Sequence, residues 1–269
     1  MARPIARAVL SFGLVAIPVE IHFAVMDKSV RFHWLHAKCG SRVRNRFFCP
    51  VCQIPVERQD LVRGYEIEKG RYVQVTEAEL EALEAEANRN IELREFIPID
   101  KVDPVYFEKP YYLGPDEGGE KPYRLLADAM EKSGRAALAE MVFHEREKLV
   151  LIRPAKGGLV LHMMYYATEV RDFNAIPKAE NERITPEEVE LATGLIEKLS
   201  SDAFEPEAYT DEYRERVLAL IEAKLQGREI TVPRPAKPRA QVIDIHAALK
   251  KSLETARPRE KADRRRKKA

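Results

Sequence analysis

All three cysteines of this 269-residue chain lie in a single window, residues 36–52, which reads HAKCGSRVRNRFFCPVC. The spacing is His36-x2-Cys39-x9-Cys49-Pro-x-Cys52. Two ligand pairs, each separated by two residues, are typical of a tetrahedral zinc site with thiolate and imidazole ligands. A Cys3His site leaves no coordination position open, so the ion we predict here is structural rather than catalytic.

Other interpretations of this window remain open. Cys49 and Cys52 could form a redox pair, or all three thiols could be unligated. His33 could replace His36 as the fourth ligand, and a Cys3His site could also form between two copies of the chain. The same window holds four basic side chains, Lys38, Arg42, Arg44 and Arg46. A metal loop rich in arginine suits a surface that contacts phosphate.

The net charge of +1 conceals a strong segregation along the chain. The net charge is +5 over residues 1–60, −7 over residues 61–150, −6 over residues 151–230 and +9 over residues 231–269. Basic blocks at both ends suggest a nucleic-acid partner that the overall charge would not reveal. We find no signal peptide and no long apolar run, so we expect a soluble cytoplasmic, nucleoid-associated protein without membrane partners.

The elements that must position these residues are mostly strands up to about residue 170. Alternating apolar residues predict two strands within residues 5–25, a third in SVRFHWL, a hairpin in GYEIEKGRYVQVT and strands in IELREFIPI and VYFEKPYYL. KLVLIRP and LVLHMMYYATEV flank a Gly-Gly turn and predict another hairpin. Helices are expected at residues 77–88, which Thr76 and Glu79 cap, and at residues 122–133, which end at Gly134.

After residue 183 the apolar period changes to that of helices. We expect helices at residues 187–200 and 211–226, then a proline-rich spacer, a short helix in VIDIHAALKKSLE and a disordered basic tail. The predicted domains are therefore residues 1–183, with the cysteine loop inside them, residues 184–229 and residues 230–269. The short helix has no neighbour in sequence to pack against.

Enzyme chemistry is not expected. The chain has no phosphate-binding glycine motif and no nucleophile elbow, and His144 and His162 lie in apolar, strand-like contexts that favour packing over catalysis. A metal-dependent nuclease or deaminase would need an open metal site with a carboxylate nearby. A sequence-reading zinc-ribbon transcription regulator is the alternative function, but it would need a basic recognition helix, and the helices expected here are acidic.

Five ordered motifs resemble the bacterial Ku family: SFGLVAIPV, GYEIEKGRYVQVT, DPVYFEKPYYLGPDEGGEKPYRLLADAM, LVLHMMYYATEVRD and DEYRERVLALIEAKLQG. They cover roughly residues 7–227, and VIDIHAALKKSLE with its basic tail also resembles the family. The cysteines are not universal in that family, so the zinc prediction rests on their spacing in this chain.

The resemblance implies an α+β fold whose β-barrel core carries an arch, with a C-terminal helical pair and a flexible basic tail. It implies a homodimeric ring that threads onto double-stranded DNA ends and recruits an ATP-dependent ligase in non-homologous end joining. A ring needs a basic inner surface, for which we predict Arg31, Lys38, Arg42, Arg44 and Arg46, with the tail residues Arg264, Arg265, Arg266, Lys267 and Lys268 as further contacts.

The ligase contact is expected on the helix at residues 211–226, which follows the core. Its predicted contact residues are Glu212, Tyr213, Glu215 and Arg216. An acidic helix would suit a basic, DNA-binding ligase. The alternative is that the apolar stripe of this helix packs on the preceding helix.

Overall fold

We analysed a computed structural model that describes residues 3–85, 90–143, 146–179, 182–227 and 245–255. The chain divides into two compact units, Met1–Lys28 with Phe32–Ala175, and Ser29–Arg31 with Ile176–Ala269. No helix among the described residues is long and apolar enough to cross a membrane.

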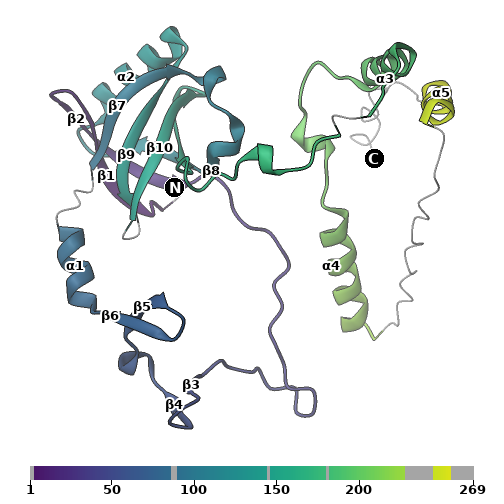
Figure 1. The fold of residues 1–269 in the computed structure, drawn as a ribbon. Helices are drawn as coiled ribbons and strands as arrows, with labels where there is room; N and C mark the ends of the chain where they lie inside the picture. The colour runs from purple at the N-terminus through teal and green to yellow at the C-terminus, as the bar shows by residue number, and fades with distance from the viewer. Residues whose placement is uncertain (1–2, 86–89, 144–145, 180–181, 228–244, 256–269) are drawn as a thin grey trace. The chain divides into compact units, whose positions relative to one another are not determined.

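The first unit is built on a closed barrel of seven strands (Figure 1). Their order around the barrel is β1-β2-β8-β11-β10-β9-β7. A ring with an odd number of strands cannot have antiparallel neighbours throughout, and here β1 and β7 form the parallel pair that closes it. The strands are β1 (Ala6–Phe12), β2 (Val15–Phe23), β7 (Asn90–Pro98), β8 (Phe107–Pro115), β9 (Arg135–Phe143), β10 (Arg146–Ala155) and β11 (Gly158–Met164).

The alternation of apolar residues explains the barrel interior. In β2, Ile17, Val19 and Ile21 are almost fully buried, whereas the residues between them are less so. Side chains of a strand point alternately to its two faces, so this pattern fills the interior from one face of each strand. The predicted barrel core and the hairpin formed by β10 and β11 are confirmed. Strand β9 was not predicted.

Helix α2 (Glu120–Ser133) packs against the barrel through a single apolar face. Its buried residues, Tyr123, Leu126, Ala127 and Met130, recur at helical spacing, and Gly134 ends the helix in the left-handed conformation, as predicted. The helix begins where no side chain fits, because a Cβ at Gly119 would lie 2.4 Å from the carbonyl oxygen of Pro18 in β2. The barrel wall and the helix N-terminus therefore approach each other backbone to backbone.

The hydroxyl of Tyr123 joins α2 to two neighbouring strands. It donates a hydrogen bond to the carbonyl oxygen of Leu113 in β8 at 2.6 Å and accepts one from the N–H of Leu159 in β11 at 2.8 Å. Leu113 and Leu159 are paired across the two strands. One buried phenol thus satisfies two backbone groups that would otherwise lack partners. Burial raises the pKa of Tyr123, which keeps the hydroxyl proton in place as a donor.

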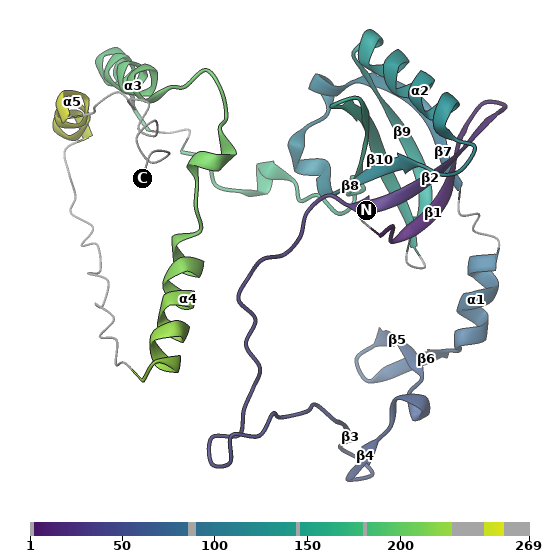
Figure 2. The same cartoon turned by 180° about the vertical axis from the view of Figure 1, so that it is seen from behind.

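Residues 24–85, called the inserted segment here, lie between β2 and β7 (Figure 2). They form two small hairpins, β3 (Phe47–Cys49) with β4 (Ile54–Val56), and β5 (Arg63–Glu68) with β6 (Arg71–Val75), followed by helix α1 (Glu77–Ala85). The predicted hairpin and the Thr76–Glu79 capping box are confirmed. The strand predicted in SVRFHWL is wrong: only an isolated bridge joins Leu35 to Arg42, because no neighbouring strand lies along it.

The second unit contains α3 (Pro186–Leu199), α4 (Glu212–Leu225) and α5 (Ile245–Thr255). The capping box of Thr185 and Glu188 opens α3, as predicted. The short C-terminal helix has no packing neighbour close in sequence, but it does pack on a helix that lies far from it along the chain. Helix α5 packs on α3, where the ammonium of Lys198 donates to the carbonyl oxygen of Leu253 at 2.6 Å and His246 lies 3.3 Å from Glu187. The proline-rich spacer and the basic tail lie outside the described residues.

We expect Tyr123→Phe to destabilise the first unit by about 1–3 kcal/mol, because it leaves the Leu113 carbonyl and the Leu159 N–H buried without a partner. Denaturant unfolding measures the change. Tyr112→Phe is the matched control, since Tyr112 is 53% exposed on the neighbouring position of β8. Equal stability of the two variants would show that the bridge contributes nothing.

We expect Leu253→Ala to loosen the contact between α5 and α3, because the Leu253 side chain lies against Gly194 of α3. The loss of about 1 kcal/mol of apolar burial should raise amide hydrogen exchange in α3 several-fold. Glu254→Ala, at an exposed neighbouring position, should leave that exchange unchanged. Exchange in α3 that is the same in both variants would mean that α5 does not protect it.

Candidate nucleic-acid interface

The predicted DNA-contacting residues of the inserted segment lie on and around a short turn that its own backbone holds. The N–H of Val43 donates to the carbonyl oxygen of Trp34 at 2.9 Å, and the N–H of His36 donates to that of Ser41 at 2.9 Å. Gly40 stands at the tip with a φ of +70°. The turn therefore has a defined shape although it belongs to no sheet.

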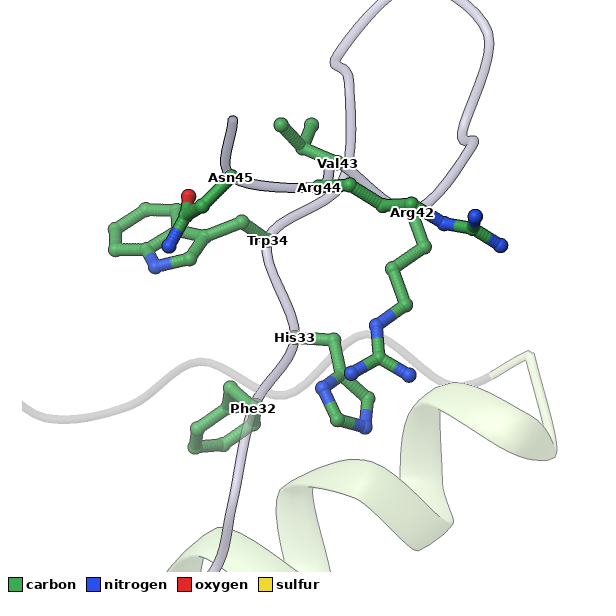
Figure 3. A pocket seen from close by; sticks show the side chains of 7 residues that line it. All are labelled: Phe32, His33, Trp34, Arg42, Val43, Arg44 and Asn45. Carbon is green, nitrogen blue, oxygen red and sulfur yellow. The ribbon is translucent and has the colours of Figure 1, made fainter. Parts of the chain in front are cut away.

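Figure 3 shows on which side of the chain the side chains of this turn lie. Arg42, Arg44 and His33 point to one side of the chain, and Phe32, Trp34 and Asn45 to the other. These six residues and Val43 line an open hollow of about 590 Å³. The turn thus presents a basic side and an aromatic side.

The electrostatics of this region differ from those of the barrel. Residues 28–56 contain six Lys or Arg and no Asp or Glu. On the barrel, arginines have carboxylate partners: Arg7 lies 3.1 Å from Glu20, and Arg94 lies 2.7 Å from Glu140. In the described part of the chain no ion pair engages Lys38, Arg42, Arg44 or Arg46, and all four are exposed. Arg31 is exposed as well. Lys38, Arg42, Arg44 and Arg46 can therefore bind an external anion without first breaking an ion pair.

Trp34 is the functional candidate that the sequence interpretation missed. It is the single tryptophan of the chain, and its side chain is 87% exposed. Exposed aromatic rings of this kind stack on nucleobases, so Trp34 is a candidate contact for nucleic acid. The signal in the sequence was a lone tryptophan within a stretch that has no acidic residue.

A second cluster at the ends of β2, β8 and β9 was also missed. The ammonium of Lys109 lies 5.1 Å from the ring centre of Phe23 and 5.5 Å from that of Tyr111, and Tyr111 packs edge-on against Phe143. These cation–π contacts hold Lys109 in place over the barrel end. The positions of Phe23 and Tyr111 in alternating strands gave no hint that they would meet.

The predicted zinc ligands form two close pairs. The Nδ1 atom of His36 lies 3.1 Å from the sulfur of Cys39, and the N–H of Cys52 donates to the sulfur of Cys49 at 3.5 Å. The three cysteines are free. Among the described residues, no three His, Cys, Asp or Glu side chains are close enough to share a metal ion, so the complete four-ligand site stays a prediction.

Hydrogen bonds set the acidity of these thiols. The hydroxyl and the N–H of Ser41, together with His36, lower the pKa of Cys39 to about 7. The N–H groups of Cys52 and Val51 lower the pKa of Cys49, and the hydrogen bond and charge of Cys49 raise that of Cys52. Each pair thus holds one thiol whose pKa is lowered by hydrogen bonds to its sulfur.

The remaining predicted residues are those of the ligase contact, the basic tail and the two histidines expected to be structural. Glu212, Tyr213, Glu215 and Arg216 are exposed on the first turns of α4, which the side chain of Asp211 caps. The tail residues 264–268 lie outside the described residues, and so does His144. His162 is packed in the barrel wall, where burial and the nearby Arg153 lower its pKa and keep it neutral, which agrees with the structural role expected for it.

Comparison with known proteins identifies the relatives of this chain. A family model described as the Ku70/Ku80 beta-barrel domain matches residues 11–191. A protein of Anaeromyxobacter sp. is 44% identical over 260 residues, which cover 96% of this chain and 88% of the relative. A protein of Koribacter versatilis is 41% identical over 265 residues, which cover 98% and 90% of the two chains.

A third relative, from Symbiobacterium thermophilum, is 40% identical over 255 residues, and this chain spans only 63% of its length. All three relatives are named non-homologous end joining protein Ku. That name refers to a repair process and to no catalysed reaction, in line with the expectation that the chain is not an enzyme. On the family model and on identity over nearly its whole length, the chain belongs to the Ku family.

Proposed function

We propose that this protein binds the ends of double-stranded DNA without reading their sequence, and that it does so as a homodimeric ring in non-homologous end joining. The observation that carries the proposal is the turn at residues 32–45, with exposed basic side chains that no carboxylate neutralises. Phosphate contacts supply affinity and are indifferent to sequence. The part of the proposal that concerns non-homologous end joining rests on the name of the relatives.

The exposed apolar surface of the inserted segment supports the proposal that two copies of the chain associate. None of residues 24–80 is buried, and large apolar side chains stand in water along both of its hairpins. They include Phe47, Phe48, Val51, Ile54, Tyr65, Ile67 and Tyr72. Exposed apolar surface of this extent is typical of an interface. A second copy of the same segment would cover it and would close the ring that the family resemblance implies.

A ring also explains why ends are the target. A closed ring can load only where the duplex terminates, so its preference for ends comes from topology and needs no contact with bases. The sequence-reading zinc-ribbon regulator is not supported: α1 carries Glu77 and Glu79 in its first turn and α4 carries Glu212 and Glu215, which would repel phosphates. The relatives give it no support either.

The ligase partner is the finer part of the proposal. Helix α5 packs on α3, and the alternative that the apolar stripe of α4 packs on α3 stays open. Tyr213 is 69% exposed and Leu225 is 82% exposed, so both ends of the stripe remain uncovered. A stripe next to an acidic first turn suits a basic partner, and we propose that α4 receives the ATP-dependent ligase.

The proposal predicts binding to linear duplex and much weaker binding to covalently closed circles of the same sequence. If a ring neutralises about eight phosphates, the logarithm of the binding constant should fall with the logarithm of salt with a slope of about −7. Arg42→Ala combined with Arg44→Ala should weaken binding to all sequences alike and reduce that slope by about 2 per chain.

Arg124→Ala is the matched control, because Arg124 is an exposed arginine of the barrel unit that is paired with Asp128 at 2.8 Å. It should leave the slope unchanged. Equal affinity for circles and linear duplex would exclude the ring. An unchanged slope in the Arg42 and Arg44 variant would remove the turn from the interface while leaving the ring intact.

Reversing Glu212 and Glu215 to lysine should preserve dimerisation and end binding but lower the stimulation of ligation several-fold, because the partner loses its charge complement. Ligation of linear duplex by the ligase, with and without this protein, measures the effect. Glu207→Lys is the control, since Glu207 is exposed before α4. If stimulation persists while end binding is normal, the ligase binds elsewhere.

A further inference from the structure

The backbone of the turn at residues 32–45 has the register of an antiparallel pair. The N–H of Val43 donates to the carbonyl oxygen of Trp34 at 2.9 Å, and Leu35 is bridged to Arg42. Trp34 therefore stands opposite Val43. Side chains of an extended chain alternate between its two faces, and residues that stand opposite each other in such a pair share a face. The turn should thus have two distinct faces.

These two faces differ in chemistry. Figure 3 shows the rings of Phe32 and Trp34 on one side of the chain, and the guanidinium groups of Arg42 and Arg44 on the other. Residues of both faces line the same open hollow of about 590 Å³. The turn contains no Asp or Glu. The hollow therefore offers aromatic rings and cations together, with no carboxylate in the turn to repel an anion.

The two aromatic rings are spaced to receive one planar group. Phe32 and Trp34 are two positions apart, which in an extended chain corresponds to about 6.6–6.8 Å. A nucleobase in a stack takes up about 3.4 Å, so rings that stand side by side at this spacing leave room for one base. The two side chains are 68% and 87% exposed, and within the described residues neither makes an aromatic contact. Both rings are thus available for stacking.

Only an unpaired base can enter between two rings. Inside a duplex both faces of a base are covered by its neighbours, and the terminal pair still stacks on the pair beneath it with one face. An unpaired base offers both faces. Asn45 also points to the aromatic side, and its amide can donate to and accept from the edge of a base. The aromatic side therefore suits a single-stranded nucleotide.

The charge of the turn favours a nucleotide over a second copy of the chain. Two copies of the turn in contact would bring Arg42 and Arg44 of one chain close to those of the other, where like charges repel. A nucleotide instead supplies a ring for the aromatic side and phosphates for the basic side. Its chemistry complements both faces of the turn.

We propose that the hollow of this turn binds one unpaired nucleotide of a single-stranded overhang. The base stacks between Phe32 and Trp34, and the adjoining phosphates lie against Arg42 and Arg44. The protein then holds the overhang of a DNA end as well as the duplex behind it. This inference rests on the proposed binding of DNA ends, and it adds that unpaired bases at the end increase the affinity.

Three linear duplexes of one sequence test the proposal with the full-length protein. One is blunt, one carries a short thymine overhang, and one carries an abasic overhang of the same length, which keeps the phosphates and removes the bases. The base advantage is the ratio of the affinity for the thymine overhang to the affinity for the abasic overhang. Stacking of one base on aromatic side chains predicts a base advantage of about 5- to 150-fold.

The fluorescence of Trp34 gives a second readout, because Trp34 is the single tryptophan of the chain. A base stacked on the indole should quench this fluorescence. We expect more quenching by the thymine overhang than by the abasic overhang or the blunt duplex. Equal quenching by all three would show that no unpaired base reaches the ring, and would overturn the proposal.

Variants of the turn show whether the ring is responsible. Trp34→Ala should reduce the base advantage to about one, and Trp34→Phe should retain most of it, because a phenyl ring also stacks. Leu35→Ala is the matched control. Leu35 is an apolar residue that is 59% exposed, and it stands opposite Arg42 on the basic face. The control should keep the base advantage, since it removes no ring.

The possible outcomes separate this inference from the proposed function. A base advantage of about one in the wild type, with linear duplex still bound in preference to closed circles, would overturn the inference and leave end binding intact. Failure to bind any linear duplex would overturn both. Loss of the dimer in Trp34→Ala would assign the ring to a contact with the second copy. Equal loss of the base advantage in Leu35→Ala would trace it to the shape of the turn. Either result would overturn the inference.

Discussion

The parallel pairing of β1 with β7 is the constraint from which the rest of the first unit follows. Because seven strands close the ring, one pair must run in parallel, and β1 meets β7 through Val9–Asn90 and Leu10–Ile91. Parallel neighbours cannot be joined by a tight turn. Along the chain β7 follows β2, but it pairs on the other side of β1, so the chain leaves the barrel after β2, and residues 24–85 lie between these two strands. The barrel supplies a rigid frame, and the closing pair creates the segment that is available for function.

The two parts of this unit handle charge and apolar surface in opposite ways. The barrel buries an apolar interior and pairs its surface arginines with carboxylates, as Arg94 does with Glu140. None of residues 24–80 of the inserted segment is buried, and among the described residues no ion pair engages Arg42, Arg44 or Arg46. A surface that stays in contact with water is stable when its charges are paired and its apolar groups are buried. A surface that binds a partner instead keeps exposed apolar groups and unpaired charges for that partner to cover. This contrast separates scaffold from interface without reference to any relative.

Sequence reasoning succeeded where short-range chemistry decides the structure. The capping boxes at Thr76 and Thr185, the turn at Gly157 and the left-handed end of α2 at Gly134 all follow from neighbouring residues. Sequence reasoning failed where contacts between residues far apart in the chain decide the structure. Strand β9 is rich in alanine, a helix former, yet Ala136, Ala137 and Ala139 are fully buried because only small side chains fit there. The packing of α5 on α3 depends on residues far apart in the chain.

The order of strands around the barrel has a consequence for biosynthesis. Strand β2 ends at Phe23, but its neighbour β8 begins at Phe107 and the last barrel strand, β11, ends at Met164. A ribosome adds roughly 5–20 residues per second, so the first hairpin waits on the order of ten seconds with Leu10, Ile17 and Val19 uncovered. Long-range pairing is also slow to form once the partners exist. The nascent hairpin thus exposes for this time apolar side chains that the finished barrel buries almost completely.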